Sequence, residues 1–144
     1  MYCLIEGDYI NKRFVGSICE EKAANYLVNN GYQIICKNYR PCKIGEIDII
    51  AKNDEFICFV EVKARTSIYF GMPSQSVNRK KQLTIRNIAM IYLKSNFLID
   101  SVIRFDIVEI IFDRIKINNN SISNTTDDNE DIIIKDINLI KNAF

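Results

Sequence analysis

Histidine is absent from the 144-residue sequence, which has 18 acidic residues. Without it, the chain cannot build a Ser-His-Asp or Cys-His catalytic unit, because both need an imidazole base. Zinc sites with histidine ligands are excluded for the same reason. If the protein is an enzyme, its acid–base chemistry must come from carboxylates, lysine, tyrosine, cysteine or water at a metal.

The sequence also lacks an apolar run near the roughly 20 residues that a membrane span requires. Its first eight residues contain no basic side chain, so no secretory signal is visible. Five cysteines occur, at positions 3, 19, 36, 42 and 58, without a C-x-x-C pair. This odd set supports neither a disulfide framework nor a cysteine zinc site. We therefore expect reduced thiols in or near the core of a cytoplasmic protein.

Apolar residues form 48% of the chain and charged residues 26%, a balance typical of one soluble globular domain. The net charge of +1 hides an asymmetry. Residues 1–117 carry 17 basic and 13 acidic side chains, whereas residues 118–144 carry two basic and five acidic ones. The basic first part permits a polyanionic partner but does not require one.

Hydrophobic periodicity predicts two helices. Apolar residues recur every three or four positions from Phe14 to Leu27, which indicates a helix that ends near residues 29–31. A second helix is expected after Pro73, capped by Ser74 or Ser76 and running to about residue 96.

Short apolar runs predict four strands, at residues 32–38, 44–51, 56–64 and 102–112. A hairpin turn at Asn53-Asp54 would join the second and third. The order α-β-β-β-α-β is typical of an α/β sandwich with a mixed sheet flanked by helices. We expect a core over residues 1–117, a polar loop or insertion over 118–131, and a last segment, 132–144, that docks back on the core.

Charged side chains interrupt the apolar strands at 44–51 and 56–64. Residues i and i+2 of a strand share a face, so Glu61 and Lys63 point the same way, and so do Glu46 and Asp48. If the registers match, Asp48 and Glu61 lie side by side. Such charges are costly within apolar strands unless they compensate one another or bind something.

Two interpretations of this hairpin remain open. Asp48, Glu61 and Lys63 form an ion-pair cluster that only neutralises itself, since Glu–Lys pairs are common on half-exposed strands. Alternatively, the two carboxylates supply the oxygens that Mg²⁺ or Mn²⁺ prefers, and the lysine orients an attacking water or stabilises the transition state. The second interpretation needs no histidine, which favours it in this chain.

The ordered motifs around the hairpin resemble a known family. Twelve residues separate Asp48 from Glu61-x-Lys63, within the segments GEIDII and FVEVKAR, and Glu20 precedes them on the first expected helix. This set resembles the PD-(D/E)xK, restriction-endonuclease-like nucleases, in particular the archaeal Holliday-junction-resolvase type, and more closely the bacterial YraN-like family of predicted endonucleases. Further matching segments run nearly end to end: 16–27, 38–40, 70–73, 77–81, 104–106 and 140–144.

The resemblance implies a restriction-endonuclease-like three-layer sandwich and a Mg²⁺- or Mn²⁺-dependent endonuclease that cuts branched or junction DNA. It implies that Asp48 and Glu61 bind the metal, that Lys63 is the catalytic lysine, and that Glu20 orients the water at the metal. A homodimer is expected by analogy, since resolvase-like relatives that cut symmetric junctions act as dimers. Ile47 stands where the superfamily pattern has proline.

Basic residues near these motifs are the expected DNA contacts. Arg65 continues the face of Glu61 and Lys63, and three cations open the second expected helix: Arg79, Lys80 and Lys81. These four side chains are predicted to neutralise phosphates beside the scissile bond. A solvated helix face is the favoured interpretation of Arg79 and Lys80 taken singly, whereas Lys81 matches the family pattern.

Two other hypotheses stay open beside the nuclease. The chain is a non-catalytic nucleic-acid-binding module that keeps the fold, or it is a structural or interaction protein whose charged hairpin is only an ion-pair cluster. Arg104 and Asp106 share a strand face and are predicted to form a structural ion pair.

Overall fold

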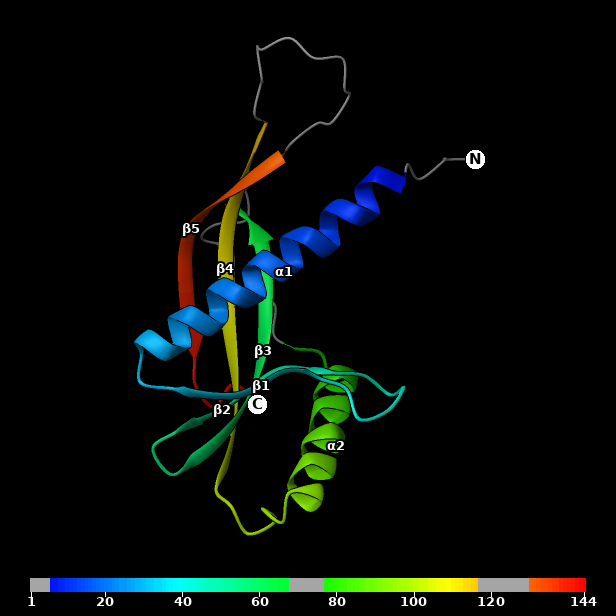
Figure 1. Cartoon of the computed structure of the whole chain (residues 1–144), viewed down its shortest axis with the longest axis vertical. Helices are drawn as coiled ribbons and strands as arrows, with labels where there is room; N and C mark the ends of the chain where they lie inside the picture. Colours follow the sequence, from blue (N-terminus) through cyan, green and yellow to red (C-terminus); the bar gives the residue numbers. More distant parts are fainter. Residues whose placement is uncertain (1–5, 68–76, 117–129) are drawn as a thin grey trace.

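The computed structural model describes residues 6–67, 77–116 and 130–144 (Figure 1). Its elements follow in this order: α1 (Glu6–Asn29), β1 (Gln33–Tyr39), β2 (Ile47–Asn53), β3 (Phe56–Thr66), α2 (Arg79–Ser95), β4 (Ile103–Lys116) and β5 (Glu130–Ile140). The strands form one mixed sheet in the order β1-β2-β3-β4-β5. Neighbouring strands are antiparallel except β3 and β4, which are parallel and lie on either side of α2 in the chain.

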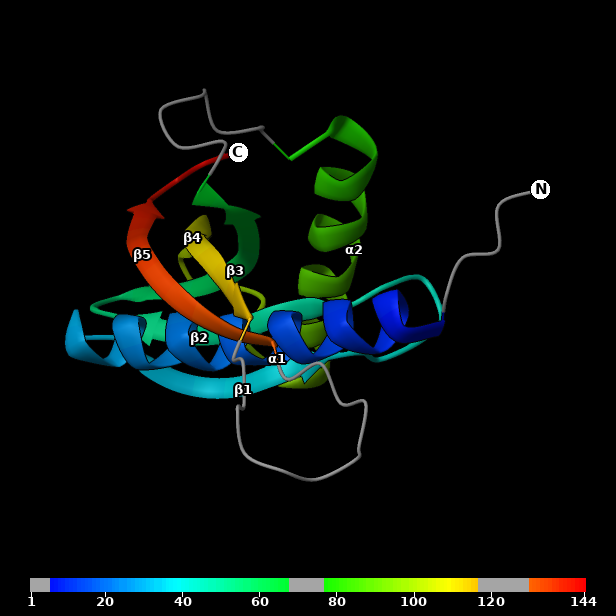
Figure 2. The same cartoon turned by 90° about the horizontal axis from the view of Figure 1, so that it is seen from above.

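The two helices cover opposite faces of this sheet and run in clearly different directions (Figure 2). On one face, α1 buries Val15, Cys19, Ala23 and Leu27 against alternate residues of β2, β3 and β4. On the other face, α2 buries Ile85, Ile88, Ala89, Tyr92 and Leu93. This arrangement confirms the predicted mixed sheet flanked by helices. Neither described helix is both long and apolar enough to cross a membrane.

The central strands are covered on both faces. In β3, Cys58 and Val60 pack toward α1, whereas Ile57 and Phe59 pack toward α2. Strands buried on both faces have continuous apolar sequences. For this reason the sequence predicted β2, β3 and β4. Against this background, the buried charged residues among those described are Asp48, Asp106 and Glu109.

Helix and turn boundaries differ from the expected ones. The first helix begins at Glu6, well before the apolar stripe. Asn78 caps α2 by accepting a hydrogen bond from the N–H of Lys81 at 2.9 Å, so the predicted serine caps, which fall outside the described residues, are wrong. The hairpin turn is at residues 54–55, because Asn53 still pairs with Phe56. Asp54 adopts φ 53°, a left-handed conformation that aspartate tolerates in turns.

The fifth strand is the largest correction to the predicted order α-β-β-β-α-β. β5 pairs antiparallel with β4 along its whole length, with one irregularity after Ile111. Its apolar side chains pack on the α1 face: Ile132, Ile134, Ile137 and Leu139. Most of the polar loop predicted at 118–131 lies outside the described residues, but residues 130 and 131 already belong to this strand.

The cysteines that the structure describes agree with the prediction except at one position. Cys19 and Cys58 are buried and Cys36 is half-buried, but Cys42 is exposed in the connection before β2; Cys3 lies outside the described residues. Burial raises the pKa of the Cys19 and Cys58 thiols to about 11, so both stay protonated at neutral pH.

Candidate active site

The charged hairpin residues face α2. Alternation along β3 puts Glu61 and Lys63 on the same side as Phe59, which packs against α2. From the first turn of α2, the Nζ of Lys81 lies 3.3 Å from the Oε1 of Glu61. The Glu61 side chain is 13% exposed and that of Lys81 is 37% exposed. The site therefore sits between the sheet and the beginning of α2.

Asp48 joins Glu61 where the β2–β3 pairing ends. The last paired residues are Ile49 and Val60, and Asp48 and Glu61 come next on their strands. The Oδ2 of Asp48 accepts a hydrogen bond from the N–H of Val62 at 2.7 Å, which fixes the direction of this carboxylate. The register thus brings together the two carboxylates that the sequence singled out.

Gly45 allows the segment before β2 to run close to α2. Its φ is +152°, and a Cβ at this position would lie 2.8 Å from the Cγ2 of Thr84. The next residue, Glu46, pairs with Arg40, whose Nε lies 3.1 Å from its Oε2. A side chain at position 45 would therefore strain the backbone at this φ and would require either Thr84 or this segment to shift.

The electrostatics of the site oppose full ionisation. Burial, reinforced by the charge of Glu61, raises the pKa of Asp48 to about 7. Burial also raises the pKa of Glu61, although the charge of Lys81 opposes this shift. Glu20 on α1 is close enough for its charge to raise the pKa of Asp48 as well. Carboxylates this close together repel each other and favour a bound proton or cation.

One oxygen of Glu61 has no hydrogen-bond donor in the part of the chain that the structure describes. Its Oε2 is buried, and no residue that the structure describes donates to it, whereas Oε1 is paired with Lys81. Leaving a buried polar atom without a partner costs about 1–3 kcal/mol. A divalent cation between Asp48 and Glu61 would satisfy this oxygen, and carboxylate oxygens are the ligands that Mg²⁺ and Mn²⁺ prefer. The residues present therefore fit such an ion.

The described residues do not by themselves enclose a metal at this point. Among the described residues, no group of three or more acidic, cysteine or histidine side chains is placed to hold an ion. Glu20 thus acts on Asp48 through its charge without completing a cage. A site built on two carboxylates leaves other coordination positions to water and phosphate, which is the usual pattern for Mg²⁺ in phosphate chemistry.

Lys63 lies between two acids. Burial lowers its pKa, while the charges of Glu61 and Glu109 oppose that shift. Glu109, which is 6% exposed, occupies the paired position on β4. It also pairs with Arg65, whose Nε lies 2.9 Å from its Oε1. Sequence reasoning missed Glu109, although a single acid within the apolar run 107–112 was a usable signal.

The expected DNA-binding cations lie in three different settings. Arg65 is 20% exposed and held by Glu109, and Lys81 pairs with Glu61 inside the site. Arg79 and Lys80 point to solvent at the start of α2. Only Lys81 of the three helix cations therefore reaches the carboxylates.

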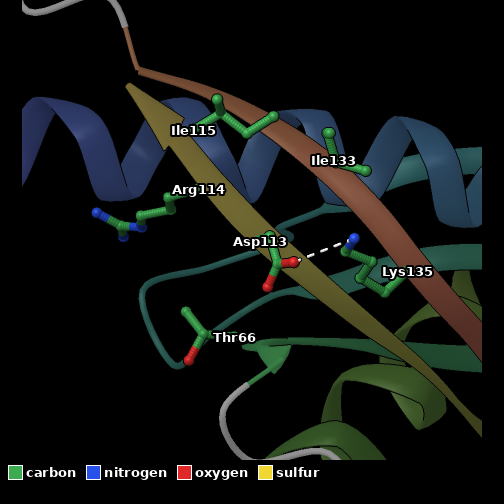
Figure 3. Close-up of a pocket in the computed structure, with 6 residues that line it drawn as sticks. All are labelled: Thr66, Asp113, Arg114, Ile115, Ile133 and Lys135. Carbon is green, nitrogen blue, oxygen red and sulfur yellow. Dashed lines mark ion pairs between the residues drawn. The ribbon is translucent and has the colours of Figure 1, made fainter. Parts of the chain in front are cut away.

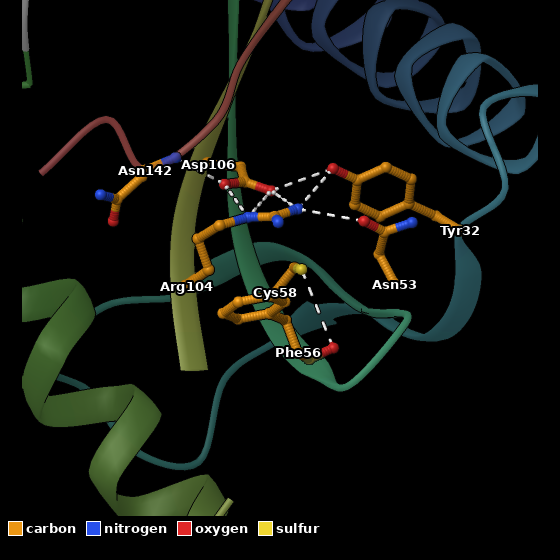
Figure 4. Close-up of polar contacts among 7 residues, drawn as sticks. All are labelled: Tyr32, Asn53, Phe56, Cys58, Arg104, Asp106 and Asn142. Carbon is orange, nitrogen blue, oxygen red and sulfur yellow. Dashed lines mark hydrogen bonds and ion pairs between the residues drawn. The ribbon is translucent and has the colours of Figure 1, made fainter. Parts of the chain in front are cut away.

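A second buried charged cluster lies on the opposite face, toward α1 (Figure 4). The carboxylate of Asp106, which is fully buried, receives hydrogen bonds from the Nε of Arg104 at 2.8 and 3.1 Å. Arg104 Nη2 also donates to the hydroxyl oxygen of Tyr32 at 2.7 Å, and the backbone N–H of Asn142 donates to Asp106 at 3.0 Å. The predicted ion pair of Arg104 and Asp106 is confirmed.

Surface hollows lie outside the carboxylate pair. One hollow of about 460 Å³ lies at the far end of β4, where Lys135 Nζ is 3.2 Å from Asp113 Oδ2 (Figure 3). Another, of about 500 Å³, is lined by Arg40, Cys42, Lys43 and Gly45 beside the site. Neither is lined by Asp48 or Glu61. The candidate site is therefore identified from its buried charges and not from a cavity.

Comparisons with known proteins give one family. The sequence model described as "Uncharacterised protein family UPF0102" matches residues 19–110, which include Glu20, Asp48, Glu61, Lys63 and Glu109. A UPF0102 protein of Acetivibrio thermocellus is 44% identical over 138 residues, or 96% of each chain. One of Caldicellulosiruptor bescii is 43% identical over 94% of this chain and 100% of its own. One of Clostridium kluyveri is 42% identical over 90% of this chain and 93% of its own.

Proposed function

The chain belongs to the uncharacterised protein family UPF0102, and we propose that it is a metal-dependent endonuclease that hydrolyses DNA phosphodiester bonds, selective for branched or junction structures. The observation that carries the proposal is the buried Oε2 of Glu61, which has no donor among the described residues. It lies in a site that also holds Asp48, Lys63 and Lys81. A restriction-endonuclease-like sandwich is compatible with the sheet between two helices.

Each residue of the site has a distinct role in this proposal. Asp48 and Glu61 hold a Mg²⁺ or Mn²⁺ ion, which when bound polarises the phosphate and lowers the pKa of water. Lys63 orients the attacking water and stabilises the negative charge that develops on the phosphate. Glu20 helps to orient the water from the α1 side, where its charge already reaches Asp48.

Cleavage assays test this proposal directly. Labelled four-way junction, flap, single-stranded and duplex DNA are incubated with the purified chain in Mg²⁺ or Mn²⁺. We expect Asp48→Asn, Glu61→Gln and Lys63→Met each to lower the cleavage rate by roughly 100-fold or more, because each removes a group that acts on the reacting atoms. The matched control is Asp136→Asn, which neutralises an exposed carboxylate on β5.

The cleavage rate of Asp48→Asn is the critical test of the nuclease proposal. Cleavage that continues undiminished in this variant would come from a contaminating nuclease and would overturn the proposal. Equal cleavage of junction and plain duplex DNA would support the nuclease activity but would contradict the proposed selectivity for branched DNA.

A non-catalytic nucleic-acid-binding module is the second candidate function. The pairing of Lys81 with Glu61 favours it, because that contact already neutralises one carboxylate of the site. This candidate predicts salt-dependent DNA binding that Mn²⁺ does not change. Calorimetric titration of Mn²⁺ into wild type and Glu61→Gln separates the nuclease from the binding module. The nuclease requires that the wild type binds Mn²⁺ and that Glu61→Gln loses this binding, whereas the binding module requires neither.

A further inference from the structure

The outer face of α2 carries positive charge and apolar side chains but no acid. From Arg79 to Lys94, the exposed residues of this helix are Arg79, Lys80, Leu83, Arg86, Asn87, Met90 and Lys94. We call these seven residues the outer face. None of its four cations pairs with a carboxylate of the described residues. Leu83 is 60% exposed and Met90 44% exposed, and the two lie two turns apart.

Phe97 follows the C-cap of α2, Asn96, and is 95% exposed. The N–H of Leu98 donates to the carbonyl of Leu93 at 2.8 Å, and the N–H of Phe97 donates to that of Lys94 at 3.3 Å. These two bonds form the helix-ending motif in which the residue at position 97 adopts a left-handed conformation, usually as glycine. Phe97 has φ 57°, a conformation that costs a bulky residue about 1–2 kcal/mol.

Neither packing nor backbone conformation explains a phenylalanine at this position. Its ring is almost wholly in solvent, and its backbone favours glycine. A residue that is unfavourable in both respects is best accounted for by a contact made with another molecule. The composition of the adjoining outer face indicates what that molecule is.

We propose that the outer face of α2 and Phe97 bind a single-stranded arm of the DNA substrate, with the Phe97 ring stacked on an unpaired base. This inference rests on the proposed function, whose substrate it specifies. Four cations without an acid complement a polyanion. Aromatic rings beside a basic groove are the usual means of holding single strands, because every base has a face on which they stack.

The charge of the outer face argues against a second copy of this chain as its occupant. Two such faces packed together would bring four cations against four, with no carboxylate of α2 to compensate them. Like charges in contact are unfavourable at an interface.

Distance along the helix gives the reach of this arm. Lys81 marks the site, and Phe97 follows 16 residues later. At 1.5 Å per residue, the separation is about 24 Å. A stacked strand advances 3.4 Å per nucleotide, so an arm of roughly seven nucleotides spans it. A strand that runs from the site toward the ring passes Arg86 and Lys94, the outer-face cations between Lys81 and Phe97.

The test uses DNA binding in EDTA, where cleavage plays no part. Fluorescence anisotropy measures the affinity of the full chain for a 12-nucleotide single strand and for a 12-base-pair blunt duplex. We expect Phe97→Gly to weaken single-strand binding about tenfold and to leave duplex binding unchanged, because stacking needs an unpaired base. The same variant should raise the Tm, since glycine relieves the left-handed backbone.

Two variants serve as controls. Phe97→Tyr keeps an aromatic ring at the same position and should retain single-strand affinity. Phe14→Ser removes another exposed phenylalanine, 57% exposed on α1, and should change neither affinity. A loss of single-strand binding in Phe14→Ser as large as in Phe97→Gly would overturn the proposal, because any exposed ring would then suffice.

Three further outcomes would overturn it. Phe97→Gly binds the single strand as tightly as wild type, or it lowers the Tm, which would make the ring structural. Alternatively, it converts a dimer to a monomer in sedimentation, which would identify a second copy as the occupant. Failure of the nuclease proposal is recognised separately. In that case the wild type does not cleave DNA, but it still binds DNA in EDTA.

Discussion

Arg104 and Asp106 on one face of the sheet, and Asp48 and Glu61 on the other, bury charge to a similar degree but differ in how it is satisfied. Each oxygen of Asp106 receives at least two hydrogen bonds, from Arg104, Tyr32 or the backbone of Asn142 (Figure 4). At Glu61, one oxygen has Lys81 and the other has no donor among the described residues. A completed network holds a fold together, whereas an incomplete one has capacity to bind a ligand.

Breaking the completed network should have the largest effect. Asp106→Ala leaves the guanidinium of Arg104, whose side chain is 12% exposed, without its carboxylate. We expect the free energy of unfolding to fall by about 3–5 kcal/mol, as for other buried pairs that lose one partner. Urea denaturation measures it, with Asp136→Ala on the exposed side of β5 as the control. A loss below about 1 kcal/mol would contradict the comparison.

Acidity should change the stability of the chain through Asp48. Burial and the charge of Glu61 raise the pKa of Asp48 from 3.8 to about 7 in the folded chain. Between these values the folded state keeps a proton that the unfolded state has lost, so stability falls as the pH rises from about 4 to about 7. The expected contribution is on the order of a few kcal/mol without divalent cations.

Urea midpoints at several pH values in EDTA measure this dependence. Asp48→Asn should flatten it and should stabilise the chain at pH 7.5, because the repulsion with Glu61 is gone. An equally steep fall in wild type and variant would show that Asp48 does not hold the proton.

Removing Lys81 should have a smaller effect, on the affinity of the carboxylate site for a cation. Its ammonium group pairs with Glu61 and competes with any cation there. We expect Lys81→Met to tighten Mn²⁺ binding roughly fivefold, the equivalent of one partly exposed ion pair. Calorimetry measures the affinity, and Lys80→Met, which alters an exposed neighbour, should leave it nearly unchanged. Unchanged or weaker binding in Lys81→Met would argue against a cation at Glu61.

Sequence reasoning located the hairpin and its two carboxylates because strand alternation is strict. Asp48 and Glu61 stood out since their neighbours, such as Ile49 and Val60, are apolar and fully buried. The fifth strand was missed because it lies at the sheet edge, where Lys135 and Asp136 face solvent and break the apolar run. Its pairing with β4 is a long-range contact that no local pattern encodes.

The sequence also could not predict which side chains surround each residue of the candidate site. The position of Glu109 opposite Lys63 follows from the parallel register of β3 and β4, which depends on how α2 docks. Arg65 was expected on phosphates, but the same register puts Glu109 within reach of its guanidinium. Residue types predicted which side chains carry charge, and tertiary pairing decided which charges meet.

The parallel pairing of β3 with β4 has a consequence for the order in which the candidate site assembles during folding. Paired residues on these strands are 46 positions apart, whereas the β2–β3 hairpin closes across a two-residue turn. Pairings of such different sequence separation form at different speeds, the local one first. Asp48 and Glu61 therefore meet early, but Glu109 and Lys81 join them only when α2 has docked and β4 has paired. A partly folded chain would hold the two acids without the groups that regulate their charge.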